Sequence, residues 1–255
     1  MVFSSIPFLF FFFPVFLILY YLVPMKAKNY VLLLFSLVFY AWGEPVYILL
    51  MLFASFVDYA NGILMTKYGT VKSKRRIFLL ISVGINLSML GFFKYADFVI
   101  HTVNGLTGLS IEPLNLALPI GISFFTFQTM SYSIDLYRQQ VKVEKNYFTY
   151  LTYVSMFPQL IAGPIVRFAT VQEELHGRVI DKKGFYEGFI RFLQGLFKKV
   201  LIANNMGAFW ELIKATEYSE LSVATAWLGA LAFTLQLYFD FSAYSDMAIG
   251  MGRML

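Results

Sequence analysis

Cysteine is absent from the 255-residue chain, which excludes disulfides, thiolate metal sites and cysteine nucleophiles. Charge is also scarce: only 14% of the residues are charged, whereas 59% are hydrophobic and 19% aromatic. A soluble domain usually carries about 25% charged residues. The composition therefore excludes a soluble, disordered, collagenous, disulfide-stapled or DNA-wrapping protein, and it indicates a membrane protein.

The recognisable catalytic motifs are missing as well. The sequence contains no glycine-rich phosphate loop, no nucleophile elbow and no cluster of metal ligands. It has two histidines, His101 and His176, and both are expected to be solvated loop residues. The residues alone therefore identify no catalytic group and no metal site.

Long apolar runs dominate what is present. A helix needs roughly 20 apolar residues to cross the bilayer, so the chain can hold at most about eight spans. Residues 3–23 form the first run, which is predicted to be an uncleaved span because no basic residue precedes it. The next run, residues 30–65, is interrupted at Gly43-Glu44-Pro45 and predicts two helices joined by a tight turn.

The net charge of +5 is concentrated between the apolar runs. Residues 67–76 carry five basic side chains and no acid, followed by an apolar helix predicted at 77–93. The positive-inside rule places this tract in the cytoplasm. Lys26 and Lys28, two spans earlier, should lie on the same side, whereas the loop expected at 94–116 should lie outside. This parity puts the amino terminus outside.

Residues 185–202 have a different pattern, with apolar and polar side chains on opposite helical faces. The polar face carries Glu187, Arg191, Gln194 and Lys198. We interpret the segment as an amphipathic helix at the membrane interface or a short core helix with one wet side. A last long helix is predicted at 222–250. The five residues after it resemble the end of a truncated chain.

Polar residues inside apolar runs are the first place to look for function, because a charge in mid-membrane costs about 2.5–3.5 kcal/mol on insertion scales. One face of the third run carries Ser55, Asp58, Asn61 and Gly62. This face predicts a seam of hydrogen bonds between helices. On the next run, small residues are spaced for close helix packing: Gly84, Ser88 and Gly91.

Residues 118–138 carry a polar ridge at helical spacing, formed by Gln128, Ser131, Tyr132, Asp135 and Arg138. Asp135 and Arg138 are three residues apart and are predicted to form an ion pair near the cytoplasmic interface. Gln128 and Tyr132 lie deeper. They fit a helix seam and a substrate tunnel equally well.

Residues 157–167 place Pro158 and Pro164 six residues apart, which a regular helix cannot accommodate. Irregular backbone at membrane depth is tolerated only where protein or a water-filled cavity covers it. Gln159 and Arg167 are therefore expected to flank a cavity. Arg167 could bind an anionic, phosphate-bearing donor, or its side chain could simply reach the interface.

The last helix contains two acids. Gln236, Asp240 and Tyr244 share one face, and Asp246 lies with Ser242 on another. Two polar faces predict a deeply internal helix. Each acid could hold helices together or line a pocket.

Three of these segments resemble motifs of the membrane-bound O-acyltransferase superfamily: LPIGISFFTFQ at 118–128, FPQLIAGPIVR at 157–167 and YFDFSAYSDMAIG at 238–250. The opening MVFSS and the FYAW stretch at 39–42 look like the bacterial alginate O-acetyltransferase branch. The resemblance thus extends along the whole chain. Gln128, Gln159, Arg167, Asp240 and Asp246 match family motifs, although this assigns them no role.

The resemblance implies an all-α, polytopic transmembrane helical bundle in a bacterial plasma (inner) membrane, with broken or re-entrant segments lining a tunnel. An acyl thioester donor, coenzyme A or an acyl carrier protein, would meet a hydroxyl of an extracellular or cell-wall polysaccharide there. Separate extracellular or periplasmic proteins would be partners. The lipid bilayer is the remaining partner, and nucleic acid is not expected.

Family members carry a buried histidine beyond the third motif, and neither His101 nor His176 matches it. The chain is therefore expected to be the amino-terminal portion of a single membrane domain, 1–255, with tunnel walls but no catalytic base. Two other hypotheses stay open. One is a transporter or flippase that uses the broken segment between Pro158 and Pro164 as its substrate site, and the other is an inactive fragment or scaffold subunit.

Overall fold

The computed structural model describes residues 2–160, 163, 166–178, 180–217 and 219–255. Helices make up 79% of the described residues, which contain no strand. The chain divides into two compact units. We call Leu19–Ile161 with Ile165–Arg178 the core unit, and Met1–Ile18, Ala162–Pro164 and Val179–Leu255 the hairpin unit.

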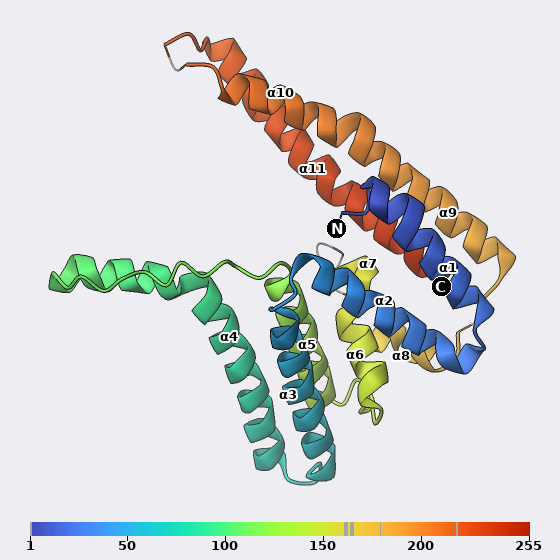
Figure 1. Ribbon diagram of the computed structural model, residues 1–255. Coiled ribbons are helices and arrows are strands. Elements are labelled where there is room, and N and C mark those ends of the chain that lie inside the picture. The colour runs from blue at the N-terminus through green and yellow to red at the C-terminus, as the bar shows by residue number, and fades with distance from the viewer. Residues whose placement is uncertain (1, 161–162, 164–165, 179, 218) are drawn as a thin grey trace. The chain divides into compact units, whose positions relative to one another are not determined.

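The described part of the core unit begins with the end of α1 (Phe13–Leu22) and continues with η2 (Met25–Ala27), α2 (Lys28–Gly43), α3 (Ile48–Lys67), α4 (Lys72–Thr107), α5 (Ile122–Tyr137), α6 (Tyr147–Ser155), α7 (Phe157–Leu160) and α8 (Phe168–His176). The predicted break at residues 43–45 is confirmed, because α2 ends and α3 begins on either side of it. Figure 1 shows α3 beside both α4 and α5, and all three pairs are in contact.

Helix α4 is longer than the sequence suggests. Residues 94–116 are predicted to be an external loop, but α4 continues through them to Thr107 and changes direction along its length (Figure 1). Nothing in this stretch stops a helix until Gly108, whose φ of 70° provides the left-handed end that glycine readily adopts. His101 therefore lies exposed on a helix, and the expected loop position was wrong.

Among the described residues, two helices are long and apolar enough to cross a membrane, α3 and α4, and Phe8–Leu22 forms a shorter apolar helix. Helices α2 and α5 have 16 residues each. At about 1.5 Å per residue, each of these reaches roughly 24 Å, a little less than the hydrocarbon thickness.

The polar face of α3 is buried, and the predicted seam is confirmed. Asp58 is fully buried; its Oδ2 accepts a hydrogen bond from Asn86 of α4 at 2.8 Å. Its Oδ1 accepts from Ser82 of α4 and, at 3.3 Å, from Ser133 of α5. Thr129 of α5 donates to Asn86 at 3.2 Å. One carboxylate thus fixes how three helices are rotated against one another.

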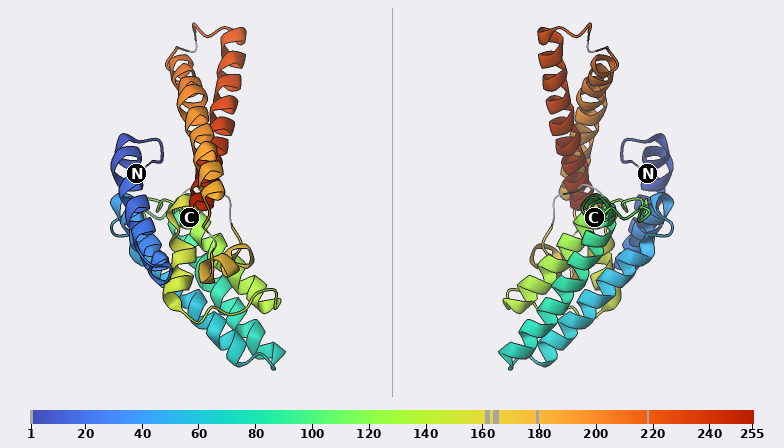
Figure 2. Two further views of the ribbon diagram at one scale, coloured as in Figure 1. Left: turned by 90° about the vertical axis from the view of Figure 1, so that its right-hand side faces the viewer. Right: turned by 90° about the vertical axis from the view of Figure 1, so that its left-hand side faces the viewer.

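The hairpin unit contains η1 (Phe8–Phe12), the first residues of α1 (Phe13–Leu22), α9 (Lys182–Phe197), η3 (Lys198–Ala203), α10 (Asn204–Lys214) and α11 (Val223–Met254). Figures 1 and 2 show α9, η3 and α10 as one nearly continuous rod lying alongside α11. The helix predicted at 185–202 is confirmed as α9 and η3.

Glycines bring α9 and α11 into backbone contact. A Cβ atom added to Gly195 would lie 2.6 Å from the carbonyl oxygen of Ala243, and one added to Gly188 would lie 2.6 Å from that of Gly250. Real Cβ atoms essentially never approach that closely. Small residues allow this kind of approach between membrane helices.

The close packing that the sequence predicts at Gly84 and Gly91 is not present. A Cβ atom at either position would meet no atom of the described structure within 4 Å. A spacing of small residues permits a close approach but does not supply the partner helix.

Gly195→Ala should lower the melting temperature of the purified full-length protein in detergent. The added methyl group overpacks the α9–α11 contact, at a cost of about 1–3 kcal/mol. Gly84→Ala is the matched control and should be neutral or stabilising, because alanine favours helix by about 1 kcal/mol where space is available. Equal melting temperatures for the two variants would contradict the packing.

Asp58→Ala should destabilise the protein by about 1–3 kcal/mol, because it leaves buried donors on α4 and α5 without an acceptor. Asp58→Asn retains one acceptor oxygen and should lose less stability than Asp58→Ala. Glu112 is exposed, so Glu112→Ala serves as a control that removes an acid without disturbing buried hydrogen bonds. Thermal unfolding checks this order, and a wild-type melting temperature for Asp58→Ala would refute the role of the seam.

Candidate functional site

Two amides predicted as site residues meet at one carbonyl in the core unit. Gln128 of α5 and Gln159 of α7 are 3% and 7% exposed. The Nε2 atom of each donates a hydrogen bond of 2.8 Å to the backbone oxygen of Tyr153. Tyr153 lies in the last turn of α6, where carbonyls have no partner within the helix. The two side chains therefore complete a helix end while lying next to each other in the interior.

Tyr132 belongs to an aromatic cluster in the same unit. Its ring centroid lies 4.7 Å from that of Tyr150 and 5.0 Å from that of Phe168. Its hydroxyl accepts a hydrogen bond of 3.1 Å from the backbone N–H of Glu144. A Cβ atom added to Gly62 of α3 would lie 3.2 Å from its ring. Tyr132 thus connects α3 and α5 to the segment before α6.

His176 and Glu144 form a pair that the sequence did not reveal. The Nε2 atom of His176 lies 2.7 Å from Oε2 of Glu144, and Oε1 of the same carboxylate accepts the backbone N–H of Asn146 at 2.9 Å. Glu144 is only 3% exposed, whereas the histidine side chain is 56% exposed. The expected loop position was wrong, because His176 is the last residue of α8, whereas its expected exposure to solvent is confirmed.

The predicted ion pair between Asp135 and Arg138 does not occur among the described residues. Arg138 follows the last residue of α5 and is exposed, whereas Asp135 is 4% exposed and its Oδ2 has no hydrogen-bond partner. Two more buried oxygens of this unit lack a partner, Thr126 Oγ1 and Tyr150 Oη. Buried polar atoms of this kind are usually satisfied by ordered water.

Arg167 differs from the buried amides in its exposure. It precedes α8 with extended backbone and is exposed, so Gln159 and Arg167 do not share the buried environment that the sequence suggested. The proline break itself falls largely on residues 161, 162, 164 and 165, which are outside the described residues.

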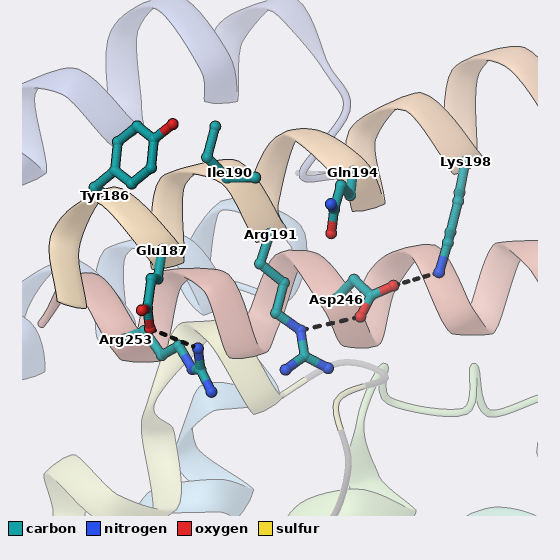
Figure 3. Close-up of a pocket in the computed structure, with 8 residues that line it drawn as sticks. All are labelled: Tyr186, Glu187, Ile190, Arg191, Gln194, Lys198, Asp246 and Arg253. Carbon is teal, nitrogen blue, oxygen red and sulfur yellow. Dashed lines mark hydrogen bonds and ion pairs between the residues drawn. The ribbon is translucent and has the colours of Figure 1, made fainter. Parts of the chain in front are cut away.

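Both acids of α11 are paired with cations of the neighbouring rod. Asp246 lies 2.5 Å from Lys198 Nζ and 3.1 Å from Arg191 Nε (Figure 3), and Asp240 lies 2.5 Å from Lys199 Nζ. The side chain of Asp246 is 16% exposed and that of Asp240 is 42% exposed. Arg191 and Lys198 were predicted on the polar face of the amphipathic helix, but Lys199 was missed because nothing in its local pattern marks it.

The other two predicted residues of α11 contact different elements of the hairpin unit. The side chain of Gln236 lies against Gly207 of α10, where an added Cβ atom would be 2.7 Å from its Nε2. The ring of Tyr244 stacks on Phe3, with centroids 4.5 Å apart. The sequence predicts that α11 is deeply internal, but within the hairpin unit it is not, because Tyr238 is 65% exposed.

A groove of about 490 Å³ lies along α9 and α11 (Figure 3), lined by Tyr186, Glu187, Ile190, Arg191, Gln194, Lys198, Asp246 and Arg253. Arg253 is paired with Glu187 at 3.2 Å. Three cations face two carboxylates, so the groove has an excess of positive charge. Its lining can bind an anionic or hydroxyl-bearing group, but it holds no histidine to act as a base.

Metal chemistry has no visible ligand set in the part of the chain that the structure describes. No group of three or more histidine, cysteine, aspartate or glutamate side chains gathers there. Among the described residues, the candidate groups for chemistry are the buried amides and carboxylates of the core unit, its His176–Glu144 pair, and the charged groove of the hairpin unit.

No protein-family model matches the chain. Curated relatives nevertheless match it over its full length. It is 42% identical over 259 residues to the probable alginate O-acetylase AlgI of Pseudomonas putida, covering 100% of this chain and 53% of that protein. The protein of the same name from Pseudomonas aeruginosa is also 42% identical, with 100% and 49% covered.

A peptidoglycan O-acetyltransferase of Helicobacter pylori is 35% identical over 288 residues, covering 99% of this chain and 54% of that protein. The chain thus spans about half the length of the curated relatives it matches. These matches cover the chain from end to end or nearly so. The chain therefore belongs to the membrane-bound O-acyltransferase superfamily, in the branch of the alginate O-acetylases, and matches the amino-terminal half of its relatives.

Proposed function

We propose that this protein is a membrane-bound O-acetyltransferase that acetylates hydroxyl groups of an extracellular or cell-wall polysaccharide. The observation that carries the proposal is the 42% identity, along the whole chain, to proteins named alginate O-acetylases. The relative at 35% identity is named for a different polymer, peptidoglycan. Transfer of an acetyl group to a polysaccharide hydroxyl is what these names share, so the acceptor polymer is left open between them.

The donor in this proposal is an acyl thioester, carried by coenzyme A or by an acyl carrier protein on the cytoplasmic side. A polysaccharide hydroxyl attacks the thioester carbonyl, the carbon–sulfur bond breaks, and the thiol leaves. A general base must accept the hydroxyl proton. We assign that base to no residue of this chain. Separate secreted or membrane-tethered acyl-transfer proteins would be its partners.

The residues of the chain would contribute tunnel walls and contacts to substrates. In the core unit the candidates are Gln128, Tyr132, Gln159 and Arg167, and in the hairpin unit they are Gln236, Asp240, Tyr244 and Asp246. The unpartnered interior oxygens of Asp135 and Tyr150 support a wet passage through the core unit. The positive excess of the groove in Figure 3 supports contact with an anionic or polar substrate.

A multi-pass position in a bacterial plasma membrane, with the amino terminus outside, completes the proposal. The two helices long enough to span, α3 and α4, and the apolar helix Phe8–Leu22 support it. The basic tract of residues 67–76, where α3 ends and α4 begins, supports the orientation. The transporter and scaffold hypotheses gain nothing from the relatives, whose names all describe acetyl transfer.

Deleting the gene should abolish ester-linked acetate on surface polysaccharide, measured as base-released acetate. Re-expression of the full-length protein should restore it. Unchanged acetylation in the deletion strain would refute the proposal. Transport of a substrate by the purified protein in liposomes, without acyl transfer, would favour the transporter hypothesis instead.

Cysteine labelling should report a cytoplasmic position for the turn between α3 and α4. Because these 255 residues contain no cysteine, Thr70→Cys introduces a single thiol into them at an exposed position. A membrane-impermeant maleimide should label it only after the cells are permeabilised. Ser110→Cys, also exposed and predicted outside, is the matched control and should react in intact cells. The reverse pattern would overturn the orientation.

A further inference from the structure

Two cations meet around one tyrosine at the end of α1 in the core unit. We call Tyr20, Tyr21, Lys28, Asn29 and Arg178 the Tyr20 cluster. Lys28 is 6% exposed, and its ammonium donates to the backbone oxygen of Tyr20 at 2.7 Å. The same Nζ atom lies 4.2 Å from the ring centroid of Tyr20 and 4.9 Å from that of Tyr21.

The guanidinium of Arg178, two residues after α8, closes the other side of the cluster. It donates to the hydroxyl of Tyr20 and to Oδ1 of Asn29. Its Nε donates to the backbone oxygen of Glu174 at 3.2 Å. Asn29 in turn donates to the backbone oxygen of Leu175 at 2.7 Å. These bonds hold both cations in fixed positions.

The positive charge of the cluster is only partly compensated. None of the described ion pairs includes Lys28 or Arg178. The carbonyls they contact lie in the last turns of α1 and α8, and each helix end carries about −0.5 charge. About one positive charge is left over. Burial, and then the charge of Arg178, lower the pKa of Lys28, so a bound anion would relieve the repulsion.

The cluster also has hydrogen-bond donors to spare. The guanidinium of Arg178 has five N–H groups, and the bonds described above use three of them. The ammonium of Lys28 has three N–H groups and uses one. Free donors in a fixed arginine fork match the oxygens of a phosphate group. The exposed Lys26 adds another positive charge two residues before Lys28.

The surroundings of the cluster favour a lipid as the source of that phosphate. Leu22 is 75% exposed, Met25 52% and Leu19 42%, all within a few residues of Tyr20. Tyrosines next to lysine and arginine, at the end of an apolar helix, are typical of the membrane interface. Lys26 and Lys28 lie on the side predicted to be cytoplasmic, where acidic lipids attract basic side chains.

We propose that the Tyr20 cluster binds the phosphate of an acidic phospholipid headgroup, with the lipid chains lying along the apolar surface of Leu19, Leu22 and Met25. Arg178 and Lys28 contact the phosphate, and Tyr20 holds both cations in place. This site is separate from acetyl transfer, and it rests on the proposed function only for the position and orientation in the membrane.

Native mass spectrometry of the purified full-length protein tests the site. With equal amounts of phosphatidylglycerol and phosphatidylcholine present, the wild type should retain one phosphatidylglycerol in preference. Arg178→Gln should weaken that retention about fivefold, as expected for one basic residue at a lipid surface. Lys72→Gln is the matched control, because it removes the same charge from the side predicted to be cytoplasmic and should retain the lipid.

Arg178→Lys keeps the positive charge but loses the fork, so it provides a milder variant should Arg178→Gln not fold. It should show an intermediate loss of phosphatidylglycerol while keeping a wild-type melting temperature. Equal retention of both lipids by the wild type would overturn the proposal, as would equal losses for Lys72→Gln and Arg178→Gln. Displacement of phosphatidylglycerol by millimolar inorganic phosphate alone would assign the site to free phosphate and overturn the proposal that its ligand is a lipid.

Discussion

A polar group surrounded by apolar side chains must find a partner, and this constraint organises the core unit. Asp58 lies in an apolar helix and is buried completely, yet its carboxylate receives hydrogen bonds from α4 and α5. Each of these hydrogen bonds can form only when each helix has one particular rotation about its axis. The acid therefore gives specificity to three helices whose apolar surfaces alone would pack in many ways.

The same constraint explains the ends of short helices. The last carbonyls of α6 have no partner within the helix, and at Tyr153 the amides of Gln128 and Gln159 provide the hydrogen bonds. Gln128 and Gln159, which match family motifs, therefore have a structural role. That role places their amide groups side by side in the interior, where a passage for substrates would need polar walls.

The hairpin unit is held by two interactions of different kinds. Glycine contacts between α9 and α11 bring the backbones together, and the ion pairs of Asp240 and Asp246 fix the position of one helix along the other. Since Asp246 is shared by two cations, the surface around it keeps a positive excess. The groove in Figure 3 is therefore a consequence of how this hairpin is aligned.

The sequence by itself determined the membrane class, the helical fold, the break at residues 43–45, the buried face of α3 and, through three motifs, the family. Each of these depends on composition, periodicity or local sequence. Only the tertiary structure decided which polar groups meet, because periodicity marks the face of a helix and says nothing about what lies opposite. Glu144 and His176 are 32 residues apart, and Lys198 and Asp246 are 48 apart. Their pairing depends on the alignment of separate helices, and so does the finding that no described residue packs against Gly84 or Gly91.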